Sequence, residues 1–335
     1  MVNAAAALVP VVVFLALLVL FDSFKLVPPR ALARALMFGA LAALAALALN
    51  GLVSQMGVVP LLVITRYLAP VLEETAKLLP IAYVVRRRQV GFPVDAAITG
   101  FAVGTGFALV ENVWYLGSLA SPGAIIWLVR GFGAAILHGA TAAILAIWSQ
   151  SLADRRPEAG ASVFLPGALA AIAIHSTYNH FVLPPVVAML VLLMVLPPLV
   201  LVVFDRSERA LREWVGAGLD LDLELLRLVL SDDFGSTRLG EYLRTLRSRF
   251  PGPVVADMFC LMRLELELSV RAKGMLLARE AGMEVPAGAD LAARLEELRY
   301  LERSIGKTGL LALRPLQVST HRDQWHRFLL GHHTP

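Results

Sequence analysis

Seven apolar runs, each close to 20 residues long, constrain the fold of this chain more than any other feature of its sequence. A helix that crosses the hydrocarbon core of a bilayer needs roughly 20 predominantly apolar residues. Apolar residues make up 58% of the 335 residues and charged residues only 17%, whereas soluble domains are typically about 45 to 50% apolar. The runs are residues 4–20, 31–49, 58–85, 96–117, 125–149, 163–183 and 186–204. The sequence therefore predicts an all-α, polytopic membrane protein with about seven transmembrane helices.

The charges between the runs predict their orientation. Lys and Arg follow the first, third, fifth and seventh runs and are absent from the other connections. Because cytoplasmic loops carry an excess of Lys and Arg, we expect the amino terminus outside and the carboxyl terminus in the cytoplasm. The first run has no preceding Lys or Arg and no small-residue cleavage signal after it. We therefore interpret it as a transmembrane helix rather than a signal peptide.

The composition changes at Asp205, where charged residues begin to alternate with leucine. Residues 219–230 and 291–301 show this alternation at helical spacing, and about 130 residues suffice to bury a core. We predict a transmembrane domain at residues 1–204 and a cytoplasmic helical domain at residues 205–335. The single cysteine, Cys260, excludes an intramolecular disulfide and a cysteine-based metal site. No nucleic-acid-binding motif is present, so no nucleic-acid partner is expected.

Ionisable residues inside the apolar runs indicate a functional site. Such residues cost a few kcal/mol each at membrane depth and usually face a bundle interior or water. At about 1.5 Å per residue from the cytoplasmic ends of their helices, Glu73, Glu74, His138 and His175 fall at one level. Glu111 lies a turn or two further outward. We expect these groups, contributed by four helices, to come together.

A structural role is the alternative for the acidic pair. Glu73 and Lys77 stand at i and i+4 with the acid first, the favourable order for a helix ion pair. Glu73 could then do no more than neutralise a buried lysine. This does not account for Glu74, because neighbouring residues point about 100° apart on a helix and the second acid needs a second partner.

The imidazole and amide groups have structural alternatives of their own. His138 could be a core histidine bonded to a backbone carbonyl, and His175 and Asn179, at i and i+4, could form a helix-packing hydrogen bond. Taken together, however, acid, imidazole and amide groups at similar depth suit hydrolysis. A carboxylate can activate water, and imidazole and amide groups can hold a metal or stabilise an oxyanion.

These residues resemble the motifs of the PrsW family of intramembrane proteases. Glu73-Glu-Thr-Ala-Lys77 matches the family's EExxK motif, and Gly106-Phe-Ala-Leu-Val-Glu-Asn112 matches its second motif. His138 and His175-x-x-x-Asn179 occupy the places of the third and fourth. The resemblance covers residues 31–183, with four motifs in order on four successive spans.

The resemblance implies an intramembrane endopeptidase in a bacterial plasma membrane. Its catalytic core would be Glu73, Glu74 and His175, with Glu111, His138 and Asn179 around it. Family members are similar to the CAAX prenyl endopeptidases and the CAAX-protease-like proteins. The implied substrate is a single-span protein such as an anti-sigma factor, cut near the outer face of the membrane.

Two mechanisms stay open at this point. Glu111, His138 and His175 could furnish three ligands for Zn²⁺ and leave a fourth position open, as a catalytic site needs. Alternatively, Glu73 or Glu74 could activate water without a metal, while the histidines and Asn179 stabilise the oxyanion. The related superfamily has been described in both ways.

Two other classes of function compete with the protease. In a proton-coupled transporter, Glu73, Glu74, Glu111 and His175 would relay protons. No half-to-half repeat is visible, however, and seven spans do not divide evenly. In a non-catalytic scaffold, the carboxyl-terminal helical domain would recruit a cytoplasmic partner.

Overall fold

The computed structural model describes residues 2–119, 123–156, 158–283 and 290–313, together with Pro315 and Leu330. Nearly all of them are helical, and none lies in a strand. The longer helices are α1 (Val2–Phe21), α2 (Pro29–Met56), α4 (Ala69–Arg86), α5 (Pro93–Ser118), α7 (Ala135–Arg155), α8 (Leu165–Asn179), α9 (Pro185–Leu230), α11 (Gly252–Glu280) and α12 (Leu291–Leu313). The shorter ones are α3 (Leu61–Val63), α6 (Ala124–Val129), α10 (Arg238–Leu246), the π-helices η1 (Ile64–Leu68) and η2 (Arg130–Ala134), and the 3₁₀-helices η3 (Gly160–Phe164) and η4 (Asp232–Ser236).

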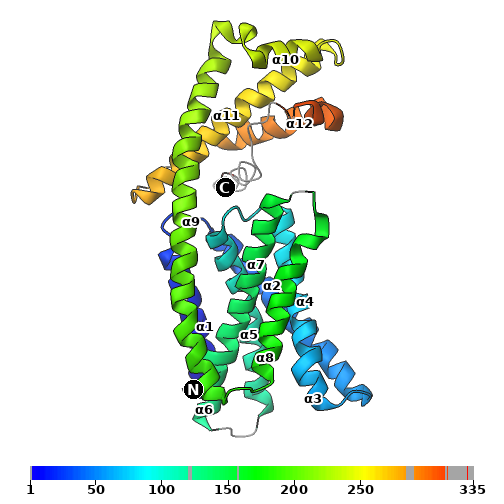
Figure 1. The fold of residues 1–335 in the computed structure, drawn as a ribbon, viewed down its shortest axis with the longest axis vertical. Helices are drawn as coiled ribbons and strands as arrows, with labels where there is room; N and C mark the ends of the chain where they lie inside the picture. The colour runs from blue at the N-terminus through cyan, green and yellow to red at the C-terminus, as the bar shows by residue number, and fades with distance from the viewer. Residues whose placement is uncertain are drawn as a thin grey trace. The chain divides into compact units, whose positions relative to one another are not determined.

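The chain divides into two compact units, Met1–Glu208 and Arg209–Pro335. In the first unit α5 is the central helix and packs against α7, α2 and α1 (Figure 1). Gly100 and Gly104 let α5 approach α7 closely, because a Cβ added at either would overlap the backbone of α7. Helices that approach this closely need small residues at the contact.

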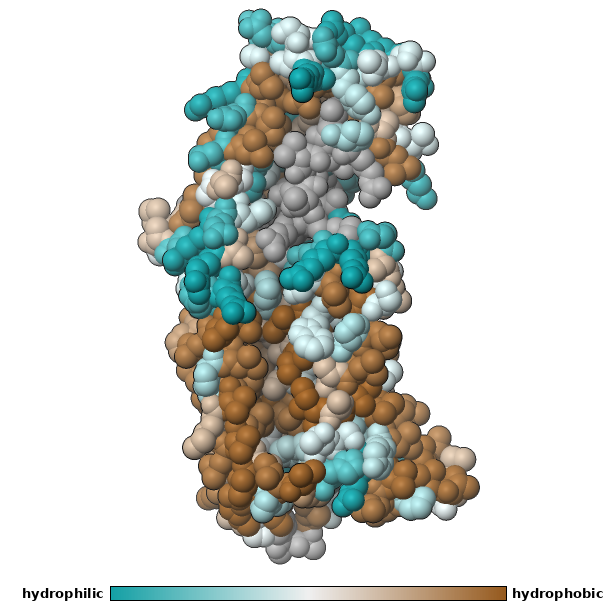
Figure 2. All heavy atoms as spheres, viewed as in Figure 1, coloured by the Kyte–Doolittle hydropathy of each residue, from teal (hydrophilic) through white to brown (hydrophobic). Residues whose placement is uncertain are grey.

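The helical membrane protein predicted from the sequence is confirmed. Six helical segments among the described residues are long and apolar enough to cross a membrane, and hydrophobic side chains cover most of the visible face of the first unit (Figure 2). These segments are Val2–Phe21, Pro29–Met56, Pro93–Ser118, Ala124–Arg155, Gly160–Asn179 and Pro185–Leu230. The remaining predicted span contains α4, whose four charged residues keep it out of this set.

The predicted span at residues 58–85 is not one regular helix. Pro60 precedes the first helical residue, the π-helix η1 follows α3, and Pro70 lies in the first turn of α4. Proline lacks the N–H that an α-helix requires, so the backbone before Pro70 adopts the wider π-turn. Pro80, the third proline of this run, is accommodated inside α4.

The change of composition at Asp205 does not end a helix. α9 continues from Pro185 to Leu230, because a helix can pass from apolar to polar surroundings without interrupting its own hydrogen bonds. The second unit has a leucine-rich core between α11 and α12 that includes Leu264, Leu268 and Leu298. Its helical character agrees with the alternation of leucine and charge.

Candidate active site

Two side-chain hydrogen bonds hold α8 against η1, just before α4. Pro70 has no N–H to donate to a carbonyl of the preceding turn. Two α8 side chains supply donors instead, since Asn179 Nδ2 donates to the Thr65 oxygen at 3.0 Å and Ser176 Oγ to the Arg66 oxygen at 2.6 Å. The same helix carries His175, which these bonds hold opposite the acids of α4.

Glu74 is the centre of a fully buried hydrogen-bond network. Its Oε1 lies 2.6 Å from Lys77 Nζ and 2.8 Å from His175 Nδ1, and it accepts from Thr141 Oγ1 at 3.2 Å. The side chains of Glu74 and Lys77 are both 0% exposed. The alternative in which Glu73 neutralises Lys77 is not what the structure shows, because Lys77 pairs with Glu74 at i,i+3. His175 and Thr141 converge on the same oxygen and hold Glu74 on that side of the helix.

Glu73 points to a different neighbourhood. Its Oε1 accepts a hydrogen bond from Asn50 Nδ2 of α2 at 3.2 Å, and its Oε2 lies 3.8 Å from His175 Nε2. The adjacent acids thus contact opposite nitrogens of one imidazole ring. Because the Glu74 carboxylate accepts from His175 Nδ1–H, the Nε2 of that ring is left to face Glu73.

Glu111 forms the outer side of the site with Arg130 and His138. Its Oε2 lies 3.0 Å from Arg130 Nη2 and 3.1 Å from His138 Nε2. Arg130 also donates to Asn112 Oδ1 at 2.9 Å and stacks over the Tyr115 ring at 3.6 Å. The neighbouring Glu111 and Asn112 of the second sequence motif therefore both hold the one arginine.

A cavity of about 590 Å³ opens beside these groups, within the usual size range of small-molecule sites. Its polar lining comes from Thr65, Glu73, Glu111, Tyr115, Arg130, His138, His175, Tyr178 and Asn179. Apolar residues of α6 and of the start of α9 form much of the rest, among them Ile125, Val129 and Val186. Glu74 does not line the cavity, so the two neighbouring acids differ in access.

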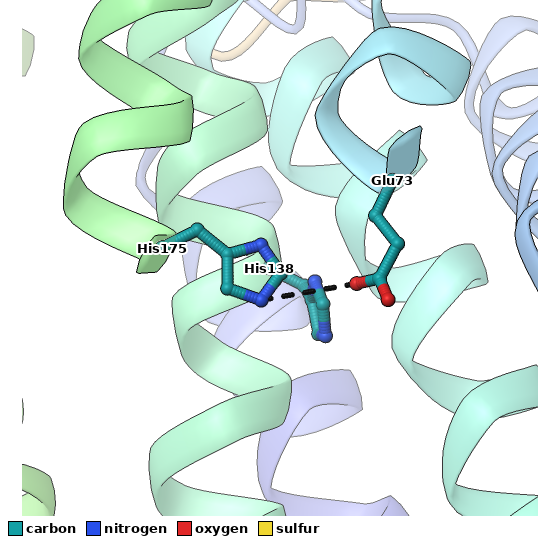
Figure 3. A group of neighbouring side chains, drawn as sticks. All are labelled: Glu73, His138 and His175. Carbon is teal, nitrogen blue, oxygen red and sulfur yellow. Dashed lines mark ion pairs between the residues drawn. The ribbon is translucent and has the colours of Figure 1, made fainter. Parts of the chain in front are cut away.

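Glu73, His138 and His175 form a group that fits a metal ion. One ligand atom from each lies within 4.8 Å of the others, and the three side chains point toward one another from α4, α7 and α8 (Figure 3). One carboxylate with two imidazoles is a donor set of catalytic zinc sites. The Glu74 carboxylate on His175 Nδ1 also fixes the orientation of this imidazole, as a carboxylate usually does for a histidine that binds a metal.

The expected ligand set of Glu111, His138 and His175 differs from this group by one residue. Glu73 takes the place of Glu111, whose carboxylate is engaged with Arg130. His138 lies between Lys77 and Glu111, since its Nδ1 is 3.3 Å from Lys77 Nζ and its Nε2 is 3.1 Å from Glu111 Oε2. An ion at this group would replace one of these two contacts of the His138 ring.

Several residues of the site were not anticipated from the sequence, and three of them hold the acids or α8 in place. Asn50 and Thr141 bond directly to the acids, and Ser176 holds α8 to η1. Asn50 directly follows the second apolar run, and Thr141 is an isolated polar residue within the fifth. A polar side chain in or beside an apolar run needs a partner inside the protein. This requirement is the sequence signal that could have identified Asn50 and Thr141.

Together these features define a class: a helical membrane enzyme with carboxylates and imidazoles at a cavity inside its bundle. A family model described as PrsW family intramembrane metalloprotease matches residues 27–203, more than half of the chain. The chain belongs to this family, as its four motifs indicated, and it is an intramembrane endopeptidase. Neither the curated proteins nor the solved structures contain a match to it.

Proposed function

We propose that Glu73 is the residue that activates water for peptide-bond hydrolysis, and that Glu74 positions His175. The observation that carries this proposal is the different placement of the two acids. Glu73 lines the cavity 3.8 Å from His175 Nε2, whereas Glu74 is 0% exposed and bonded to Lys77 and His175 Nδ1. Only a carboxylate at the cavity can reach a substrate and a water molecule together.

Glu73, His138 and His175 would hold the metal ion that the family description implies, and we propose Zn²⁺. When bound, such an ion makes a water molecule more acidic and polarises the carbonyl group of the substrate. Glu73 has two oxygens, so the one that does not hold the ion is left to accept the proton of the water. Asn50, which already donates to Oε1, keeps this carboxylate in place.

Glu111 and Asn179 complete the proposed site. Glu111 holds His138 from the outer side. Asn179 donates one amide hydrogen to the Thr65 carbonyl, and its second is left for a carbonyl oxygen of the substrate, because a carboxamide has two donors.

The substrate that we propose is a single-span membrane protein of the regulatory, anti-sigma-factor-like kind. The cavity is lined by residues at the ends of α5, α6, α8 and α9 remote from the Arg86 to Arg88 connection. With those arginines on the cytoplasmic side of a bacterial plasma membrane, cleavage would occur in the outer half of the bilayer. Residues 1–204 would form the protease domain, and residues 205–335 a cytoplasmic domain that binds a partner.

Two glutamine variants test the proposal. Glu73→Gln keeps the shape of the side chain and removes the base, so cleavage of a single-span peptide in lipid vesicles should fall by at least about a hundredfold. Glu74→Gln should lower cleavage less, by about 10- to 100-fold, as removal of a residue that orients a metal-binding histidine does. Wild-type cleavage by Glu73→Gln would overturn the assignment.

The transporter is not favoured by the family match. A transporter would instead cause vesicles to take up protons without any peptide cleavage. Measuring both in one preparation decides between the two functions.

A further inference from the structure

Phe181 stands at a backbone position that favours glycine. It directly follows His180, the C-cap residue of α8, and its φ of 51° lies in the left-handed region. Helices commonly place glycine, and sometimes asparagine, at this position, because a larger side chain there brings its Cβ too close to the following carbonyl oxygen. A phenylalanine here therefore carries a conformational cost that some other interaction has to offset.

Packing within the fold does not offset this cost. The Phe181 side chain is 61% exposed. The turn is closed by backbone groups, since the Phe181 N–H donates to the Tyr178 oxygen at 3.1 Å, and glycine would make the same bond. What distinguishes the ring is its place, because it lines the cavity that also contains Glu73 and His175.

The next residue shows that exposure to lipid alone does not explain this ring. Val182 belongs to the same turn, is apolar and is 74% exposed, but it does not line the cavity. The turn thus presents two exposed apolar side chains, and the one with the strained backbone is the one at the cavity. The cost at Phe181 is therefore linked to the cavity and to what enters it.

The ring belongs to an exposed, apolar part of the cavity lining. Ile125 and Val186 line the cavity too and are exposed, whereas Glu73 and His175 are buried. The groups that carry the chemistry therefore lie inside, and the apolar side chains lie where a substrate enters. An extended chain advances about 3.3 to 3.6 Å per residue. Substrate residues about two positions from a scissile bond at Glu73 therefore reach the other side of a cavity of about 590 Å³.

We propose that Phe181 determines substrate specificity: its ring, with Ile125 and Val186, binds a large apolar side chain of the substrate within two residues of the scissile bond. This inference rests on the proposed function of Glu73. Close packing of the substrate side chain against the ring favours leucine or phenylalanine over alanine, because a smaller side chain loses contacts that nothing replaces. Phe181 touches the substrate beside the reacting atoms and takes no part in proton transfer.

The test measures side-chain preference in the full-length protein. The substrate is a fluorescent single-span peptide in lipid vesicles, with leucine at the two positions on either side of the scissile bond, and each leucine is changed to alanine in turn. At one of these positions alanine should lower kcat/KM at least about tenfold for the wild type, as loss of an apolar group from an apolar pocket does. For Phe181→Gly the same change should lower it less than about threefold. Equal losses for the two proteins at all four positions would overturn the proposal.

The stability of Phe181→Gly separates this role from a structural one. Glycine adopts a positive φ without strain, so the unfolding temperature of the variant should stay the same or rise. Its KM for the leucine peptide should rise about tenfold while kcat changes by less than about twofold, because binding is lost without loss of the reacting groups. A lower unfolding temperature would show that the ring supports the fold, and the proposal would fail.

Val182→Gly is the matched control. It removes an exposed apolar side chain from the same turn and introduces the same residue, but it leaves the cavity lining intact. The preference for leucine should therefore persist in this variant. A loss of preference equal to that of Phe181→Gly would assign the effect to the turn or to its contact with lipid, and would refute the role of the ring.

Glu73→Gln distinguishes failure of this inference from failure of the proposed function. If Glu73→Gln is inactive and Phe181→Gly keeps the preference of the wild type, only the role of Phe181 is refuted. If Glu73→Gln is fully active, the assignment of the base is refuted, whereas a preference lost in Phe181→Gly still assigns the binding of the substrate side chain.

Discussion

Breaking the Glu74–Lys77 ion pair should lower the stability of the transmembrane unit far more than Glu73→Gln does. The two charges are 2.6 Å apart, and both side chains are 0% exposed. With an effective dielectric constant of about 20, their attraction at this distance is about 6 kcal/mol. Glu74→Gln removes the negative charge and leaves the ammonium of Lys77 buried. Its acceptors would then be the amide oxygen of the substituted side chain, Thr141 Oγ1 and His138 Nδ1, the last two both at 3.3 Å, and none of the three is charged to balance the ammonium.

We therefore expect Glu74→Gln to lower the free energy of unfolding by about 3 to 5 kcal/mol, the usual cost of removing one partner of a buried pair. Glu73→Gln should cost less than about 1 kcal/mol, because Gln can still accept a hydrogen bond from Asn50. Lys77→Met added to Glu74→Gln removes the stranded charge and should restore most of the lost stability. Reversible unfolding in mixed detergent micelles measures all three differences.

A double-mutant comparison separates this expectation from its alternative. If Lys77→Met restores the stability of Glu74→Gln and not that of Glu73→Gln, Lys77 pairs with Glu74, as in the structure. If Glu73→Gln and Glu74→Gln destabilise the protein equally and Lys77→Met restores both, the exclusive Glu74–Lys77 pair is refuted and Glu73 also pairs with Lys77.

Three further predictions follow from the site and the loops. Protein purified without chelators should carry about one metal ion per chain, and His175→Ala should lose this ion, as elemental analysis would show. Fully active metal-free protein would instead establish a mechanism by glutamate alone. Ser176→Ala should destabilise the protein by about 1 kcal/mol through the unpaired Arg66 carbonyl, whereas Thr177→Ala, on the exposed side of α8, should not. With Cys260 replaced by Ser, a Cys at Ser118 should react with an impermeant thiol reagent in intact cells, and a Cys at Arg87 should react only after permeabilisation. Labelling of the Arg87 site in intact cells would show that the orientation is the opposite one.

The helical membrane fold could be predicted because its signals are local. Apolar runs long enough to cross the bilayer identify the transmembrane helices directly. Polar residues at membrane depth identify side chains that must find partners inside the bundle. The depth of Glu73, Glu74, His138 and His175 followed from helical rise alone, and the structure brings these residues into contact.

The pairing of Lys77 could not be predicted, because both acids stand at a permitted spacing from it. Pairs at i,i+3 and i,i+4 have similar intrinsic energies of a few tenths of a kcal/mol. The choice of Glu74 depends on His175 and Thr141, which are 101 and 67 residues away in the sequence. The same holds for the π-turn at η1, since Pro70 predicts a disturbed helix but not the α8 side chains that stabilise it.

The spacing of the EExxK motif gives two neighbouring carboxylates different functions. Residues one apart on a helix point about 100° apart, so when Glu74 faces α7 and α8, Glu73 faces the cavity. Lys77, one turn later on the Glu74 side, lets Glu74 stay charged while buried, and a charged Glu74 is what orients His175 through Nδ1. Glu73 is then left to contact the other nitrogen of the same ring. A lysine one position earlier would stand at i,i+2 from Glu74 and point away from it, so the geometry of the helix requires the lysine to follow that acid by about one turn.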